Sequence, residues 1–468
     1  MRAYLATSIA VTCATALALP FSLATPAGAL PLGAAAAPTA VPPAADPAAD
    51  PVVHPSAREA APDAVPQETD VAGSTQSLPL APLGDGRRAV GGSGAGVQGL
   101  ARRDVRPFSL VGVVWDDARA HLHGTVQVRT RATGNAQWSA WQDVEIHNDD
   151  HGADPGTAEA ASGALRGATA PLWVGDSDGV EVRVRPDRQD DIAAAVAEAL
   201  PEGLRIELVD PGPEPAAARG PEPRAGLAHG ARAARRAPTV EEAAAASVNA
   251  QLASVGTAVI PAAAAAKPYI GPRPRIITRK GWGADERLRE KGFVYTKAVK
   301  AAFVHHSATG NNYTCKQAPS VLRSIYRYHT QSSGWRDFGY NFAVDKCGNI
   351  YEGRAGGVAK PVRGAHTLGF NTNSMGIAVL GTYGSTTPPA AVVTAVAKLT
   401  AWKLGLHGVN PKGKTTLVSA GGKYKKGKKV TFNSIAGHRD GYSTACPGAR
   451  LYGKLGTART ASAKYQGR

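Results

Sequence analysis

The chain has 468 residues, enough for two or three domains, but its 34 prolines and many alanines exclude a chain that is packed into cores throughout. Its formal net charge of +16 is unevenly distributed: Arg273–Arg468 holds 32 basic and 7 acidic residues, a net charge of +25, and the other residues hold 21 basic and 30 acidic, a net charge of −9. The C-terminal part is therefore expected to bind a polyanion, which could be nucleic acid, an anionic membrane or an anionic cell wall.

The first residues predict export. Met1-Arg2 is followed by an apolar run from Ala3 to about Leu23, and Ala27-Gly28-Ala29 is a small-residue cleavage pattern, so residues 1–29 are expected to be a secretory signal peptide. The alternative is an uncleaved membrane anchor, which the small residues and the proline-rich sequence after them disfavour. No later segment has eighteen consecutive apolar residues, so we expect no stable membrane insertion after cleavage. We therefore expect a secreted, wall-associated protein with no nucleic-acid partner.

Residues 30–105 are rich in alanine and proline, then in glycine, and are expected to form a disordered leader. Residues 106–211 contain short alternating runs broken by glycine and aspartate, which predict an all-β, sandwich-like accessory domain. The stretch Asp149–Gly167 is too polar and glycine-rich for a core, so we expect a long loop there. Trp138 and Trp141 could line a sugar site, but packing between strands is the favoured interpretation.

Residues 212–272 are again rich in alanine, proline and arginine and are expected to be a linker, and residues 273–460 to form an α/β domain. Strands and helices alternate there, which predicts a mixed central β-sheet flanked by helices. The expected elements are a strand at Ala301–His305, an amphipathic helix at Ala318–Thr330, a hairpin of Tyr340–Val344 with Ile350–Glu352, an apolar strand at Met375–Leu380, a helix from Pro389 to Gly405, and a lysine-rich hairpin around residues 415–432.

Two separate patterns carry candidate metal ligands. The glycine-punctuated stretch Gly437–Gly448 contains His438 and Cys446, and an imidazole with a thiol suits a borderline-soft cation such as Zn²⁺. His305 and His306 end a strand, and because successive strand residues point to opposite faces, only one of the pair can join a ligand set. Each pattern alone is weak evidence for a metal.

The cysteine count bears on the same question. Outside the apolar leader there are three cysteines, Cys315, Cys347 and Cys446, so an exported chain leaves one of them out of any disulfide. A pairing of Cys315 with Cys347 would leave Cys446 to bind a metal. The alternative is a buried, inert thiol at Cys446, which is disfavoured because free thiols tend to be oxidised in such a compartment.

Further motifs make the pattern specific. The histidine pair and the His438–Cys446 loop occur in order with four others: Gly334–Phe342 (GWRDFGYNF), Asn349–Arg354 (NIYEGR), Gly364–Thr367 (GAHT) and Asn373–Ile377 (NSMGI). This series closely resembles the peptidoglycan recognition protein family, also called type 2 N-acetylmuramoyl-L-alanine amidases. The resemblance runs from about Pro274 to about Leu455, roughly 40% of the chain.

The resemblance implies roles for individual residues. It places one Zn²⁺ per chain on His305, His438 and Cys446, a catalytic tyrosine at Tyr340, and a second polar residue near the reacting group at Thr444. It also implies a Cys315–Cys347 disulfide. We expect Asp337 and Asp440 to brace the surrounding loops or orient the ligands. Three further residues are candidates to line a substrate groove, although a structural role is the more expected one for the first of them: His306, His366 and Asn371.

The resemblance implies zinc-dependent hydrolysis of the amide bond between the N-acetylmuramoyl lactyl group and L-alanine in peptidoglycan. The β domain would then serve targeting, and the basic C-terminal domain would also hold anionic wall polymers. One alternative is a recognition protein that binds peptidoglycan without cutting it; many such family members lack the cysteine ligand, which this chain keeps at Cys446. Another is a structural protein that only adheres to the wall. The sequence does not identify the general base.

Overall fold

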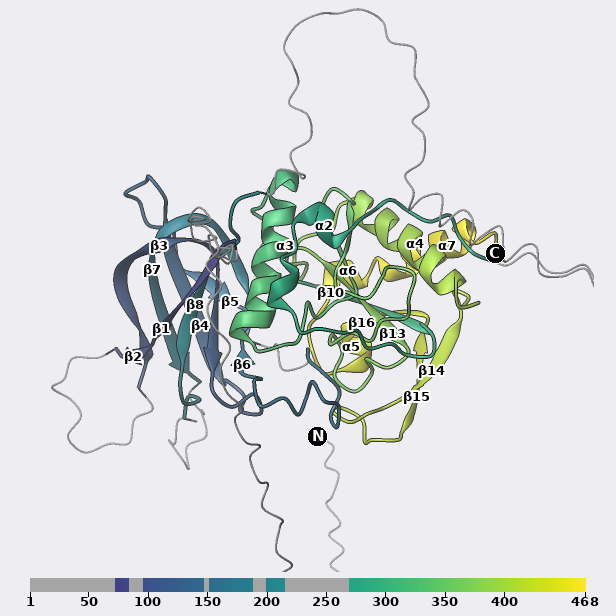
Figure 1. Ribbon diagram of the computed structural model, residues 1–468, viewed down its shortest axis with the longest axis horizontal. Helices are drawn as coiled ribbons and strands as arrows, with labels where there is room; N and C mark the ends of the chain where they lie inside the picture. The colour runs from purple at the N-terminus through teal and green to yellow at the C-terminus, as the bar shows by residue number, and fades with distance from the viewer. Residues whose placement is uncertain (1–71, 84–95, 147–150, 188–198, 215–268) are drawn as a thin grey trace, which may run out of the picture. The chain divides into compact units, whose positions relative to one another are not determined.

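The computed structural model describes residues 72–83, 96–146, 151–187, 199–214 and 269–468. They form an N-terminal all-β domain and a C-terminal domain with a mixed sheet and helices, as expected from the sequence (Figure 1). The expected signal peptide, most of the leader and most of the linker lie outside these residues. Within the described ranges, no helix is both long enough and apolar enough to cross a membrane.

The N-terminal domain is built on antiparallel strands, hydrogen-bonded in the order β1-β8-β3-β7-β4-β5, with β2 and β6 also paired to β3. Its centre follows from side-chain alternation, since every second residue of β4 is buried against matching valines of β7. The strands are β1 (Ser74–Pro79), β2 (Ala81–Pro82), β3 (Gln98–Trp115), β4 (Gly124–Ala132), β5 (Gln142–Val144), β6 (Gly167–Ala168), β7 (Leu172–Pro186) and β8 (Arg205–Asp210).

The domain begins earlier than the sequence suggested. β1, β2 and the first part of β3 lie in the stretch that we assigned to the leader. β1 has the sequence STQSLP, which lacks an alternating apolar pattern, and its antiparallel partner β8 lies about 130 residues later in the chain. A polar edge strand of this kind owes its conformation to that distant partner, so local sequence does not reveal it.

Trp138 and Trp141 stack against arginines of the same domain. The Arg183 guanidinium lies 4.0 Å from the centre of the Trp141 ring, and that of Arg102 lies 5.2 Å from the centre of the Trp138 ring. The Arg129 guanidinium is within 6.0 Å of both rings. These contacts favour the packing interpretation of the tryptophan pair over a sugar site.

The C-terminal sheet has the strand order β16-β10-β13-β11-β12-β9. The four strands β16, β10, β13 and β11 are parallel, β12 runs antiparallel to β11 as the expected hairpin, and β9 is parallel to β12. The bounds are β9 (Ile276–Ile277), β10 (Ala301–His306), β11 (Phe342–Val344), β12 (Ile350–Glu352), β13 (Ser374–Val379) and β16 (Ile435–Gly437). The lysine-rich hairpin forms a separate two-stranded sheet of β14 (Lys414–Val418) and β15 (Lys429–Asn433).

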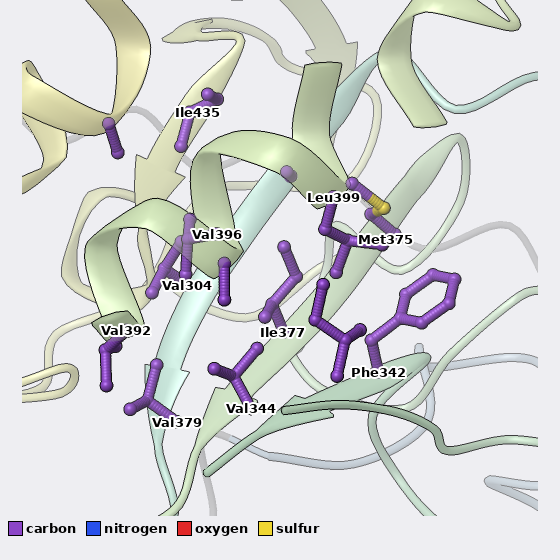
Figure 2. Packing of buried hydrophobic residues seen from close by; sticks show 14 of the residues in the cluster. Val304, Phe342, Val344, Met375, Ile377, Val379, Val392, Val396, Leu399 and Ile435 are labelled. Carbon is purple, nitrogen blue, oxygen red and sulfur yellow. The ribbon is translucent and has the colours of Figure 1, made fainter. Parts of the chain in front are cut away.

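Helices α4 (Ala390–Gly405) and α7 (Leu455–Tyr465) pack together over one face of this sheet. Pro389 precedes α4 with φ at −56°, a backbone angle already suited to a helix start. Figure 2 shows the packing between α4 residues Val392, Val396 and Leu399 and strand residues Val304, Ile377 and Val379. Because Val304 faces α4, the alternation along β10 turns His305 toward the opposite face.

On that opposite face lies α3 (Ala318–Arg327), which continues as one π-helical turn, Tyr328–Ser332. Its apolar residues join those of β3 and β8 in one hydrophobic cluster, so α3 belongs to the cores of both domains. Tyr328 extends into the β domain, where its hydroxyl donates a hydrogen bond to the Thr169 carbonyl at 3.1 Å. Gly112 makes room for this ring, since a Cβ there would lie 2.3 Å from the tyrosine oxygen.

The remaining helical segments are short. They are α2 (Arg279–Trp282), η1 (Glu286–Leu288), η2 (Cys315–Gln317), α5 (His438–Gly441) and α6 (Ala449–Tyr452). Cys315 and Cys347 form the expected disulfide, which joins η2 to the turn between β11 and β12. Cys446 takes no part in it and is buried.

Candidate metal centre

The three ligands expected from the sequence converge at one edge of the C-terminal sheet. His305 lies near the end of β10, and His438 begins α5 immediately after β16. β10 and β16 are adjacent parallel strands in which Val304 is paired with Gly437, so the following residues of both strands emerge side by side. The His305 and His438 ring centroids are 4.4 Å apart, and the Cys446 Sγ lies 3.9 Å from His305 Nδ1. All three side chains are buried.

A fourth candidate ligand comes from the N-terminal domain. The His151 ring lies 4.5 Å from the His438 ring and 5.3 Å from the His305 ring, centre to centre. One ligand atom from each of His151, His305, His438 and Cys446 can be chosen so that all four lie within 4.8 Å of one another. Sequence reasoning missed His151, because it lies in the stretch expected to be a plain loop and has no fixed spacing to the other ligands.

The chemistry of this group fits zinc. Imidazoles and a thiolate are typical Zn²⁺ ligands, and ligands at about 2.0–2.3 Å from a tetrahedral ion lie ~3.3–3.8 Å from one another. Side-chain movements of about an ångström would therefore bring the four donors around one ion. Burial holds the pKa of His305 well below its ordinary value, and the neighbouring His438 lowers it further. His305 is thus kept as the neutral imidazole, which is the form that binds a metal.

Asp440 holds the turn that carries His438. Its Oδ2 accepts a hydrogen bond from the Gly437 N–H at 2.9 Å, and its Oδ1 accepts one from the Tyr452 hydroxyl at 2.7 Å. The Arg439 N–H donates to the Cys446 carbonyl at 3.0 Å, which ties the two ends of the loop together. These bonds fix the spacing of His438 and Cys446, in agreement with the bracing role expected for Asp440.

Asp337 braces a neighbouring loop. Its Oδ1 accepts from the Phe338 N–H at 2.7 Å and from Arg279 Nη1 at 3.1 Å, and its Oδ2 accepts from the Ala355 N–H at 2.8 Å. These bonds connect the loop before Tyr340 to the one that follows β12.

His366 and Asn371 lie behind the metal centre, and neither side chain is exposed. His366 Nδ1 is 3.0 Å from Thr367 Oγ1, which lies 3.5 Å from His305 Nε2. The Asn371 Oδ1 accepts hydrogen bonds from the His366 and Thr367 N–H groups at 2.7 and 3.1 Å. In this conformation both residues support His305 rather than facing an open groove.

Tyr340, His306 and Thr444 border the other side of the centre. The Tyr340 ring lies 5.2 Å from the His305 ring, and its side chain is almost fully buried. The His306 N–H donates to the Cys446 Sγ at 3.4 Å, and Thr444 Oγ1 accepts from the Cys446 N–H at 3.2 Å. Tyr340, His306, Thr444 and Cys446 border a cavity of about 10 Å³, which is room for about one water molecule.

The comparisons with known proteins follow the division into domains. Residues 295–449 match a family model described as N-acetylmuramoyl-L-alanine amidase, and residues 60–219 match one described as an Rv3811 N-terminal galactose-binding domain-like family. Peptidoglycan-recognition protein SC2 of Drosophila melanogaster is 32% identical over 184 residues, which are 39% of this chain and 85% of that protein. The chain belongs to the peptidoglycan recognition protein family.

Two further relatives of this family illustrate its range. An N-acetylmuramoyl-L-alanine amidase of Homo sapiens is 31% identical over 188 residues, covering 39% of this chain and 28% of that protein. Among solved structures, wild-type Drosophila PGRP-LB is 26% identical, covers 39% of this chain and 93% of that chain, and has a TM-score of 0.31. The 32% identity to peptidoglycan-recognition protein SC2 over 85% of that protein confirms, at the level of the family, the resemblance that the motifs of the C-terminal domain indicated.

The bracing of His438 leads to a first prediction. Replacing Asp440 by alanine removes the acceptor for Gly437 and Tyr452, so His438 is no longer held in place. We expect metal affinity to fall about 10- to 100-fold, the usual effect of losing a residue that orients a ligand. Competition with a chelator of known affinity measures the change. Asp117→Ala, an exposed change in the other domain, is the control, and equal affinities in the two variants would contradict the bracing role.

Proposed function

We propose that the C-terminal domain is a zinc-dependent amidase that hydrolyses the bond between the N-acetylmuramoyl lactyl group and L-alanine in peptidoglycan. The observation that carries this proposal is the convergence of His305, His438 and Cys446, with Tyr340 beside them. The match to an amidase family model over residues 295–449 supports it. The Cys315–Cys347 disulfide supports the further proposal that the protein is secreted and acts at the cell wall.

His305, His438 and Cys446 would hold the zinc, which as a Lewis acid polarises the scissile carbonyl. Tyr340, whose ring lies 5.2 Å from the His305 ring, would donate a hydrogen bond to the oxygen that gains charge, a contribution of about 2–4 kcal/mol for one well-placed donor. The Thr444 hydroxyl accepts a bond from the Cys446 N–H and keeps its own proton to donate. His306, His366 and Asn371 are proposed to contact the muramoyl peptide, and of these three His306 borders the small cavity.

The zinc assignment is tested by Cys446→Ala. We expect one zinc per chain in the unmodified protein, and weaker zinc binding with loss of hydrolysis in the variant, because the thiolate is the one anionic donor among the four candidate ligands. Purified wall is digested, and new N-terminal alanine and peptide-free glycan are measured by mass spectrometry. Chelation followed by zinc addition should abolish and then restore the release. Hydrolysis at the full rate by the variant would overturn the assignment, and bound wall without release would support the recognition-only alternative.

The role of Tyr340 is tested by Tyr340→Phe, which keeps the ring and removes the hydroxyl. We expect kcat to fall about 10²- to 10³-fold, with zinc content unchanged, since Tyr340 is not a ligand. Unchanged kcat in Tyr340→Phe would show that the tyrosine hydroxyl takes no part in the reaction.

For Thr444 the pair Thr444→Val and Thr444→Ser separates a donated hydrogen bond from packing. We expect the valine variant to be slowed and the serine variant to retain most of kcat.

We also propose that anionic wall polymers bind the turn between β14 and β15. This turn exposes five lysines close together and lies beside the metal-binding loop, since Lys423 Nζ is 3.4 Å from the Tyr442 carbonyl. The lysines are Lys423, Lys425, Lys426, Lys428 and Lys429. We expect binding to purified wall to weaken, and to lose its dependence on salt, when anionic polymers are stripped from the wall. Unchanged affinity and salt dependence would contradict this partner.

A further inference from the structure

The metal centre is covered by a piece of the N-terminal domain. Residues 151–166, here called the covering segment, precede β6 in that domain but lie against the C-terminal domain. The segment starts at the centre itself, where the His151 ring is 4.5 Å from the His438 ring and 5.6 Å from the Tyr340 ring. The sequence predicted a polar loop in this stretch. The structure instead buries two of its acidic residues, Asp154 and Glu159, which the polarity of the sequence placed outside any core.

Asp154 is the first of two buried anchors. Its Oδ1 accepts hydrogen bonds from the Gly369 N–H and from the Asn371 side-chain amide, each at 2.8 Å. The same amide donates to the Gly152 carbonyl at 2.8 Å. Burial raises the pKa of Asp154, and the bonds from Asn371 and Gly369 oppose that rise. The Asp154 Oδ2 is buried without a hydrogen-bond partner among the described residues, so the bonds that Oδ1 accepts are what hold the segment at this position.

Glu159 is the second anchor. Its two carboxylate oxygens accept from both terminal nitrogens of Arg354 at 2.8 and 2.9 Å, and both side chains are buried. Arg354 Nε is fixed in turn by the Phe338 carbonyl at 2.7 Å. Burial acts to raise the pKa of Glu159, but the charge and hydrogen bonds of Arg354 outweigh it, and the net shift is downward. The pair is therefore ionised. Its bidentate geometry fixes how Glu159 of the segment is aligned with Arg354 of the C-terminal domain.

The far end of the segment closes against the turn after α3. The Arg166 N–H donates to the Ser333 carbonyl at 3.2 Å. Gly334 has φ at +73°, and a Cβ there would lie 1.9 Å from the Ala164 carbonyl oxygen. Only glycine both adopts this backbone angle readily and leaves room for the approach. The C-terminal domain thus contacts the segment near its start, at its middle and at its far end.

This arrangement leaves little room at the candidate metal centre itself, although a larger cavity of about 580 Å³ borders the covering segment beside Trp115 and Trp335. The cavity at the centre holds about one water molecule, and the Asn371 amide, proposed to contact substrate, is bonded to the segment instead. With His151 the centre has four protein ligands, the number found in closed structural zinc sites, whereas catalytic sites keep one position open. We propose that the covering segment holds most of the amidase population in an inactive state, with His151 as the fourth zinc ligand. This inference rests on the proposed zinc-amidase function.

Metal ligation tests the His151 part directly. Zinc X-ray absorption of the full chain should show three imidazoles and one thiolate, and His151→Ala should show two imidazoles and one thiolate. His121→Ala, which changes an exposed histidine of the same domain, should match the unmodified protein. Two imidazoles in the unmodified protein would overturn the assignment of His151, whatever the activity.

Turnover and hydrogen exchange test the inhibition. Asp154→Ala with Glu159→Gln removes the first anchor, weakens the second and leaves every zinc ligand in place. We expect kcat/KM on a soluble N-acetylmuramoyl peptide to rise at least tenfold in this variant and in His151→Ala, and amide exchange over residues 151–166 to quicken. Asp154→Ala alone serves if the double variant fails to fold. Equal kcat/KM in the unmodified protein and all opened variants, with hydrolysis present, would overturn the inhibition and leave the proposed function intact.

Failure of the proposed function has a different signature. In that case neither the unmodified protein nor any opened variant hydrolyses the probe, although exchange shows the segment released and zinc remains bound. The ligand count still decides separately whether His151 binds the metal.

Discussion

The site depends on the parallel pairing of β10 with β16. Because Val304 is opposite Gly437, the next residues, His305 near the end of β10 and His438 directly after β16, lie side by side at the same edge of the sheet. Two imidazoles 133 positions apart in the chain thereby come within 4.4 Å, centre to centre. The pairing is secured by the apolar residues of the opposite face, which pack under α4 and α7. A metal centre of this kind is a product of the core beneath it rather than of the loops around it.

Around this pair, polar groups do the positioning. Asp440 fixes the turn of His438, Thr367 and His366 lie behind His305, and Asn371 holds the backbone of both. Each of these side chains is buried or partly buried, where an unsatisfied polar group is costly, so the network has few alternative arrangements. The same reasoning applies to Glu159 and Arg354, whose value lies in specifying one way for two domains to meet.

The sequence was informative wherever a residue's neighbours in space are set by its own element. Alternation along β10 indicated that His305 and His306 face opposite sides, and helical spacing gave α3 and α4 nearly to the residue. The ligand set itself came from a resemblance of motifs, because nothing local joins His305 to Cys446. What the sequence could not show depends on contacts between domains: β1 is defined by β8, and His151, Asp154 and Glu159 look like solvent-facing loop residues until Asn371, Arg354 and His438 are placed opposite them.

The disulfide has a consequence for how the two domains stay together. Cys315 and Cys347 enclose 32 positions of chain in a covalent ring, and that ring contains α3, the π-helical turn and Tyr340. Helix α3, which packs into both cores, and Tyr340, beside the candidate metal centre, therefore lie within the same disulfide-closed loop. Closing such a ring removes conformations from the unfolded chain. An oxidising environment thus restricts this segment even when the surrounding contacts open, so α3 and strand β11 stay joined through such openings.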